Sequence, residues 1–175
     1  MSLSQHTVII RSAKAQDREC LAQLINDNSL LANTSLHPYI SEEQRLDLID
    51  FNHKEPVYLI AEMNSKLCGY VCLYTSSKFR EKHVAYLAIA VHSDYQNQGI
   101  GKQLMQESLH LSDNWLNIIR IELDVSTQND RAVSLYKKLG FEIEGEKKYA
   151  SFGHGTYNNL YFMARISPSF LESQQ

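Results

Sequence analysis

Short apolar segments alternate with amphipathic segments along the chain, and this pattern predicts a mixture of strands and helices. Runs rich in β-branched and aromatic residues, bounded by turn residues, are typical of strands. Apolar residues spaced three and four apart are typical of helices. The predicted helices begin at Asp17 and at the capping segment Ser41–Glu43, and cover residues 99–112 and 130–139. The predicted strands cover residues 7–11, 56–63, 67–75, 84–91, 118–125, 141–144 and 159–166.

The order of these elements predicts a mixed sheet of about seven strands flanked by about four helices, in the α/β (α+β) class. Residues 84–91 (VAYLAIAV) are nearly all apolar, which is typical of a central strand covered on both faces. This strand is joined to 118–125 through a helix, so the two are expected to lie parallel with a right-handed crossover. Along 118–125 apolar residues alternate with Glu122 and Asp124, so these two acidic side chains share one face.

The composition indicates one folded domain over residues 1–175. Hydrophobic residues make up 43% and charged residues 21%, with 7 glycines and 3 prolines, which excludes disordered, collagen-like and low-complexity chains. A chain of this length buries enough surface to form a core of its own. The net charge of −3 argues against a nucleic-acid partner, because such a partner requires a basic face. The 10 tyrosines are amphipathic and suit the wall of a polar cleft.

Cysteine usage and the lack of membrane signals predict a cytoplasmic protein. The cysteines, Cys20, Cys68 and Cys72, are odd in number, which favours reduced thiols. Cys68 and Cys72 lie four apart in a predicted strand, so we expect both to be buried on one face. No His or Cys spacing suits zinc, so no metal is expected. No apolar run approaches the ~20 residues of a membrane span, and MSLSQHTVII lacks the pattern of a signal peptide.

The segment from Gln96 to Gly101, followed by Lys102, predicts an anion site. It follows an apolar strand and begins a helix, where glycines admit a ligand close to unpartnered N–H groups. A pyrophosphate suits such a site. A dinucleotide-binding GxGxxG would need glycine at Leu104, and a Walker loop would need glycine at Gln96 and Ser or Thr at Gln103, so neither is present. The alternative is a glycine turn that merely starts a helix.

Two segments resemble motifs of the GNAT acetyltransferase superfamily. Residues 89–101 (IAVHSDYQNQGIG) are similar to its motif A, and residues 129–141 (NDRAVSLYKKLGF) are similar to its second motif. With the intervening strand, the resemblance covers residues 84–145. It is weaker over residues 1–73, where this fold usually carries acceptor specificity. A closer resemblance to the bacterial L-amino-acid N-acetyltransferases and the phosphinothricin acetyltransferases runs through residues 113–116, 120–123, 140–145, 147–150 and 161–165.

The resemblance implies that two parallel strands, here 84–91 and 118–125, splay apart and that acetyl-CoA inserts between them. Backbone groups of residues 89–91 would pair with the pantetheine like an added strand, and an N–H there would stabilise the thioester oxygen. N–H groups from residues 98–102 would hold the pyrophosphate. Asn129 would bind the pantetheine end, and it also suits a helix N-cap. The implied cofactor residues are Ile89, Ala90, Val91, Gln96, Asn97, Gln98, Gly99, Ile100, Gly101, Lys102, Asn129, Ala132 and Tyr136.

The resemblance also implies catalytic residues for attack of a neutral amine on the thioester. Tyr136, seven residues after Asn129, takes the position of the family's general-acid tyrosine. A tyrosine with a pKa of about 10 can stabilise or protonate a thiolate whose thiol has a pKa of about 8.5. Asp124 takes the position of the catalytic glutamate of the ribosomal-protein acetyltransferases, acting directly or through water, and Glu122 is the second candidate. The alternatives are that Tyr136 packs in the core and that both carboxylates are solvated or ion-paired.

The implied acceptor is the amine of a small molecule, an amino acid or an amino-acid-like compound. An α-amine with a pKa of about 8 needs a weaker base than a lysine-like amine with a pKa of about 10.4. A protein N-terminal or polyamine N-acetyltransferase is the alternative, and a non-catalytic acyl-CoA sensor is another. The resemblance allows a homodimer, and no nucleic-acid or membrane partner is expected. The candidates to line the acceptor pocket come from residues 33–39, 71–76 and 148–157 and are Tyr39, Tyr74, Tyr149 and Tyr157. Tyr86, by alternation with Ala88, is expected to point into the same region.

Overall fold

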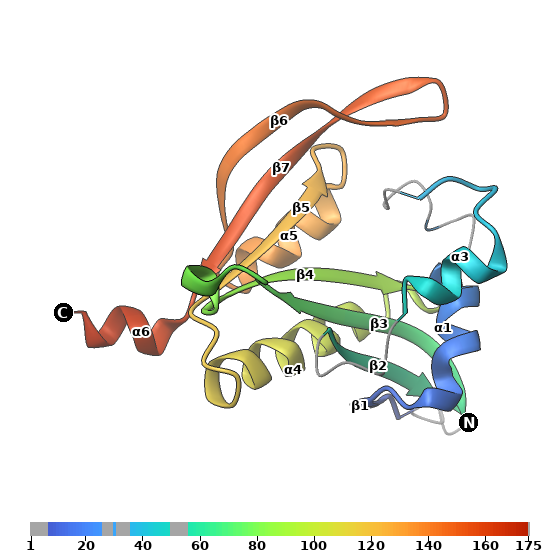
Figure 1. Cartoon of the computed structure of the whole chain (residues 1–175), viewed down its shortest axis with the longest axis horizontal. Coiled ribbons are helices and arrows are strands. Elements are labelled where there is room, and N and C mark those ends of the chain that lie inside the picture. The colour runs from blue at the N-terminus through green and yellow to red at the C-terminus, as the bar shows by residue number, and fades with distance from the viewer. Residues whose placement is uncertain (1–6, 26–29, 31–35, 50–55, 175) are drawn as a thin grey trace, which may run out of the picture.

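The computed structural model describes residues 7–25, 30, 36–49 and 56–174. One sheet at its centre contains the strands β1 (Ile9–Ser12), β2 (Val57–Met63), β3 (Lys66–Thr75), β4 (Val84–Val91), β5 (Arg120–Ser126), β6 (Glu142–Gly153) and β7 (Thr156–Ile166). Their order across the sheet is β1-β2-β3-β4-β5-β7-β6 (Figure 1). β4 and β5 are parallel, and the other neighbouring strands of this sheet are antiparallel. The predicted mixed sheet with one parallel pair is therefore confirmed.

Helices lie on both faces of the sheet. The α-helices are α1 (Arg18–Ile25), α3 (Glu42–Asp47), α4 (Ile100–Asn114), α5 (Asp130–Lys138) and α6 (Pro168–Ser173). The 3-10 helices are η1 (Ala15–Asp17), η2 (Phe79–Glu81) and η3 (Ser93–Tyr95). The first four α-helices match the predicted ones, and α6 is an addition to them. Within the described ranges, no helix is long and apolar enough to cross a membrane.

Two cores form because successive side chains of a strand point to opposite faces. On β3, Tyr70 and Cys72 pack in a core with α1, whereas Val71 and Leu73 pack on the other face in a core with α4. Tyr136 of α5 belongs to the α4 core. β4 lies in the middle of the sheet, as predicted.

The two cysteines of β3 lie in different cores, so the prediction that they share a face was wrong. Cys68 packs in the α4 core and Cys72 in the α1 core. Ala61 pairs with Gly69 and Glu62 with Leu67, so the register shifts at Cys68. A β-bulge of this kind inserts one extra residue into a strand, and the alternation of side chains is lost there.

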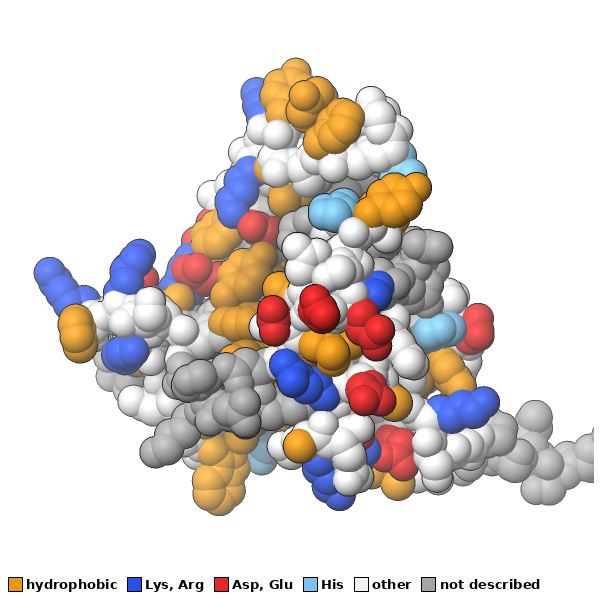
Figure 2. Space-filling view, turned by 45° about the vertical axis from the view of Figure 1, so that its right-hand side comes forward, with side chains coloured by type: hydrophobic (Ala, Val, Ile, Leu, Met, Phe, Trp, Pro, Cys, Tyr) orange, Lys and Arg blue, Asp and Glu red, His pale blue; other side chains and the backbone are white. Residues whose placement is uncertain are grey.

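The last two strands form a hairpin that is much longer than predicted. β6 and β7 continue to a turn at His154 and Gly155, where φ is 50° and 76°. Only residues 160–166 of β7 pair with β5, so residues 148–158, called the hairpin arm below, project past the end of that strand (Figure 1). Most β6 side chains are exposed, so the sequence has no alternating apolar pattern to reveal the strand. Figure 2 shows hydrophobic side chains gathered at the top of the molecule, where the arm ends.

Candidate active site

The parallel strands β4 and β5 separate partway along their length. Their pairing begins at Val84 and Arg120 and ends at Tyr86 and Glu122. Beyond that point β4 stays paired with β3, and β5 stays paired with β7. The predicted splay is therefore present, and it opens a gap between residues 87–91 and 123–126. The prediction that β4 is covered on both faces was wrong at this end, because residues 88–91 are partly exposed.

The backbone of β4 presents hydrogen-bonding groups to this gap. The N–H of His92 donates to the carbonyl of Cys68 (2.9 Å), and the N–H of Ser76 donates to the carbonyl of Val84 (3.0 Å). Antiparallel strands alternate between residues that bond to the partner and residues that do not. The even-numbered residues of β4, Ala90 among them, therefore bond toward β3. The backbone groups of Ile89 and Val91 turn toward the gap.

The opposite wall of the gap carries Asp124, whose N–H donates to the hydroxyl oxygen of Tyr86 (3.2 Å). Tyr86 thus reaches from β4 to β5 at the point where the strands separate. Burial and the nearby carboxylate of Asp124 raise the pKa of Tyr86 above its ordinary value. The hydroxyl consequently keeps its proton at neutral pH.

The loop after β4 presents a group of backbone N–H donors at the start of α4. Asn97 and Gly99 have positive φ angles of 62° and 81°, and this conformation turns the chain into α4. The N–H of Gln103 donates to the carbonyl of Gly99 (3.1 Å). Among the described residues, no acceptor receives the backbone N–H groups of residues 98–102. Such an array at a helix N-terminus attracts anions, and Lys102 adds a positive charge.

Arg131 of α5 clamps this loop. Its Nη1 donates to Oδ1 of Asn97 (2.8 Å), and its Nη2 donates to Oε1 of Gln96 (2.9 Å). The amide nitrogen of Gln96 in turn donates to the carbonyl of Val91 (3.0 Å). The side chains of Gln96 and Asn97 therefore position the loop. Sequence reasoning did not single out Arg131, although it lies inside the segment 129–141 that resembles the second motif.

Asn129 and Tyr136 occupy the two ends of α5. Oδ1 of Asn129 accepts the N–H of Ala132 (3.1 Å), so its role as an N-cap is confirmed. Tyr136 is only 8% exposed, and its ring contacts that of Phe141, with a centroid distance of 5.8 Å. Burial raises the pKa of Tyr136 to about 12, with a smaller contribution from Tyr86. Its hydroxyl makes no hydrogen bond to the residues described here, and it is protonated at neutral pH.

Both candidate carboxylates form ion pairs. Both oxygens of Asp124 accept from Nζ of Lys147 (2.7 Å). Oε1 of Glu122 accepts a hydrogen bond from Nε of Arg120 (2.6 Å). Nη1 of the same arginine donates to Oε1 of Glu144 (2.8 Å). The guanidinium of Arg120 lowers the pKa of the Glu144 carboxyl. The ion-paired alternative therefore describes both carboxylates in the resting protein.

The tyrosines proposed for the acceptor pocket divide into two groups. Tyr74 of β3 lies directly opposite Tyr86 of β4, so both side chains stand on the face that carries Asp124, and they are 41% and 38% exposed. Tyr149 and Tyr157 instead contact each other in the hairpin arm, with ring centroids 6.3 Å apart. Residues 33–35 of the predicted loop 33–39 lie outside the described residues, and Tyr39 at the end of that loop is 90% exposed.

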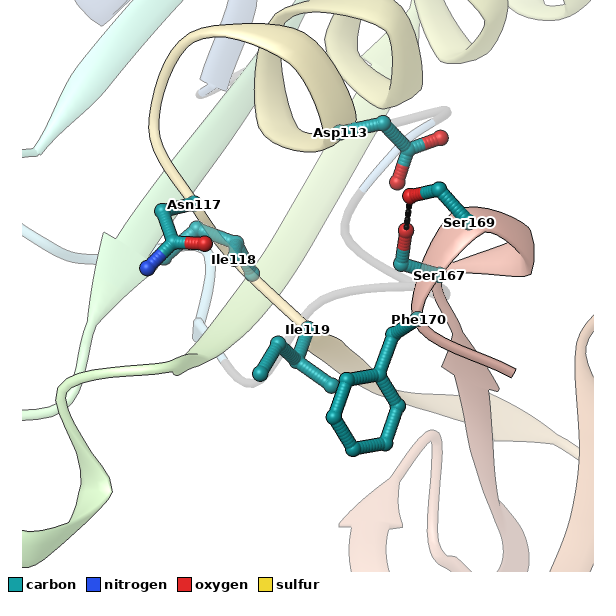
Figure 3. A pocket seen from close by; sticks show the side chains of 7 residues that line it. All are labelled: Asp113, Asn117, Ile118, Ile119, Ser167, Ser169 and Phe170. Carbon is teal, nitrogen blue, oxygen red and sulfur yellow. Dashed lines mark hydrogen bonds between the residues drawn. The ribbon is translucent and has the colours of Figure 1, made fainter. Parts of the chain in front are cut away.

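One shallow pocket lies away from the gap (Figure 3). Its volume is about 170 Å³, and it is lined by residues from the end of α4, from the segment just before β5, and from Ser167 and the start of α6. Figure 3 shows Asp113 and Ser169 on one side and Phe170 on the other. Because it flanks the beginning of β5, it is separate from the gap, which opens toward the other end of that strand. In the part of the chain that is described, no group of three or more His, Cys, Asp or Glu could hold a metal ion.

Comparisons with known proteins agree with this geometry. Residues 23–141 match the family model described as Acetyltransferase (GNAT) family. The chain belongs to this family. It is 33% identical over 159 residues to the L-amino acid N-acetyltransferase AaaT of Escherichia coli (strain K12), and the match covers 91% of this chain and 98% of that protein. It is 25% identical over 170 residues to the spermidine N(1)-acetyltransferase of the same strain, and this match covers 96% of this chain and 90% of that protein.

The fold of this GNAT enzyme is also that of solved structures. The structure of yncA from Salmonella typhimurium with its cofactor acetyl-CoA has a TM-score of 0.82 and 19% identity, and the match covers 91% of this chain and 94% of that one. The protein is therefore an N-acetyltransferase of the GNAT family that acts on an amine.

Proposed function

We propose that this enzyme acetylates the α-amino group of a free amino acid or an amino-acid-like compound. The observation that carries the proposal is the group of side chains at the split between β4 and β5. Asp124 and Tyr86 meet there, and Tyr136 lies close enough for Tyr86 to influence its pKa. The 33% identity to an L-amino acid N-acetyltransferase over nearly the whole chain supports the acceptor class.

The gap and the loop fit the two ends of acetyl-CoA. Backbone groups of Ile89 and Val91 face the gap, as strand-like contacts with a pantetheine require, and Ala90 forms the wall behind them. Asn129 and Ala132 begin α5 on the other side. The free N–H groups of residues 98–102 suit a pyrophosphate. We assign the cofactor to these residues, with Gln96 and Asn97 holding the loop in shape.

The attack of the amine requires a base and a group that stabilises negative charge. Acetyl-CoA supplies an acetyl thioester, whose carbonyl carbon forms a bond to the amine nitrogen as its bond to sulfur breaks. Asp124, directly or through a water molecule, removes a proton from the incoming ammonium so that the amine attacks in its neutral form. An N–H of Ile89 stabilises the negative charge that develops on the thioester oxygen. The proton held by Asp124 then passes to solvent. The nitrogen loses its second proton to solvent as the sulfur leaves, which gives the neutral amide.

Tyr136 stabilises the leaving sulfur by a hydrogen bond. Its pKa of about 12 lies above the value of about 8.5 for a thiol. The tyrosine therefore donates a hydrogen bond to the thiolate, and at equilibrium the proton stays on the tyrosine. The thiolate then takes a proton from solvent. Removing the hydroxyl should therefore slow the chemical step and leave acetyl-CoA binding intact.

A thiol-release assay tests this proposal. Acetyl-CoA is offered with free amino acids, spermidine and short peptides, and mass spectrometry identifies each product. We expect thiol release with free amino acids and an N-acetyl product. Binding of CoA without thiol release for any amine would support the non-catalytic sensor instead. Release with spermidine alone would support a polyamine acetyltransferase, an activity named for a relative that is 25% identical.

A further inference from the structure

A lysine on β6 neutralises the proposed base. Nζ of Lys147 lies 2.7 Å from both carboxylate oxygens of Asp124 and 5.1 Å from the ring centre of Phe162. The side chain of Lys147 is 48% exposed and that of Asp124 is 22% exposed. Exposed ion pairs of this kind are weak because water competes for both charges. A solute with charges of its own can therefore separate them.

Two arginines near the gap already have partners among the described residues. Arg120 is held by Glu122 and Glu144. Arg131 is held by the side chains of the phosphate loop. Among the described residues, the Lys147 ammonium pairs with Asp124. In the proposed mechanism the same carboxylate must bind the amine of the acceptor. Lys147 therefore loses its counter-charge whenever an ammonium group takes Asp124.

We infer that the Asp124–Lys147 pair recognises a zwitterion, with the acceptor's ammonium on Asp124 and its α-carboxylate on Lys147. This inference rests on the proposed function and names its specificity residue. An α-amino acid carries both charges close together, so it replaces each partner of the resting ion pair with an equivalent one. A polyamine replaces only one of them and brings a second cation toward an unpaired lysine. Lys147 thus favours amino acids over polyamines.

Substitution of Lys147 tests this role. The variants are Lys147→Met, which keeps a chain of similar length without charge, and Lys147→Arg, which keeps the charge. Lys78→Met is the matched control, because Lys78 forms an exposed ion pair with Glu81 (3.0 Å) in η2, outside the gap. The free L-amino acids are screened first, and kinetics follow with the best acceptor, its amide and its decarboxylated amine. Thermal unfolding shows that each variant is folded.

We expect Lys147→Met to lower kcat/KM for the free amino acid about 10- to 100-fold, mostly through KM, and to change it less than about threefold for the amide. The ratio of variant to wild type for each acceptor cancels differences in amine pKa. Lys147→Arg should retain most of the preference, and Lys78→Met should match the wild type.

Two results would overturn the inference alone. One is an equal loss for the free amino acid and its amide in Lys147→Met, which would mean that the lysine only shapes the site. The other is a wild-type enzyme that prefers the amide to every free amino acid. An absence of thiol release with every amine would overturn the proposed function and this inference together.

Discussion

Replacing Arg131 with alanine should weaken binding of acetyl-CoA through its pyrophosphate. The substitution removes the two hydrogen bonds to Gln96 and Asn97, of 2.9 and 2.8 Å, and it also removes a positive charge beside the loop. Both bonds are exposed, so each is worth about 0.5–1 kcal/mol rather than the larger value of a buried ionic bond. The loop then loses about 1–2 kcal/mol of preorganisation, which corresponds to about a 5- to 30-fold weaker affinity.

Two acetyl donors separate this effect from general damage. We expect KM for acetyl-CoA to rise about 5- to 30-fold in Arg131→Ala with kcat nearly unchanged. Acetylpantetheine lacks the pyrophosphate, so its kinetics should change much less. Arg131→Lys should be intermediate, because a single ammonium lacks the two-pronged geometry of a guanidinium. Arg80→Ala, which removes an exposed arginine of η2, is the control. An equal loss with both donors would refute the role of the clamp.

Three further predictions follow from the site. Tyr136→Phe should lower kcat about 100-fold with little change in CoA affinity by calorimetry, and an unchanged rate would remove Tyr136 from the mechanism. Gly99→Val should weaken CoA binding because a β-branched residue is strained at a φ of 81°, whereas in Gly101→Ala the added carbon meets no atom closer than 3.7 Å; equal effects would contradict this reasoning. Burial raises the pKa of Tyr136 to about 12, so its contribution to stability is complete below about pH 10 and lost as the pH rises toward 12. Chemical denaturation should therefore show a loss over this range that is up to about 2–3 kcal/mol greater in the wild type than in Tyr136→Phe.

Features that depend on neighbouring residues were predictable from the sequence. The turn at Asn64 and Ser65, where both φ angles are positive, follows from residue types that tolerate this conformation. Ser41 caps α3 by accepting the N–H of Gln44 (3.1 Å), as expected of serine before a helix. The start of α4, with Gly99 as its N-cap, is predictable for the same reason. In each case a short segment contains all the groups that form the feature.

Features that depend on the exact register of strands, or on contacts between distant segments, were not predictable. The bulge that moves Cys68 to the other face arises from the register between β2 and β3. β6 has few buried side chains of its own, and its strand conformation depends on hydrogen bonds to β7. Arg131 has no distinctive sequence signal for the loop it holds, because the contact joins residues 34 and 35 positions apart.

By itself, the sequence determined which local segments form the candidate site: a glycine loop after an apolar strand, a capped helix with a tyrosine, and acidic residues on one strand face. These depend on residue types at fixed local spacing. The tertiary structure decided the state and the neighbours of those groups. It placed Asp124 against Lys147, joined Tyr86 to the opposite wall of the gap, and turned Ile89 and Val91 rather than Ala90 toward the opening. Charge and backbone direction at the site depend on the register between strands, and register is a property of the whole sheet.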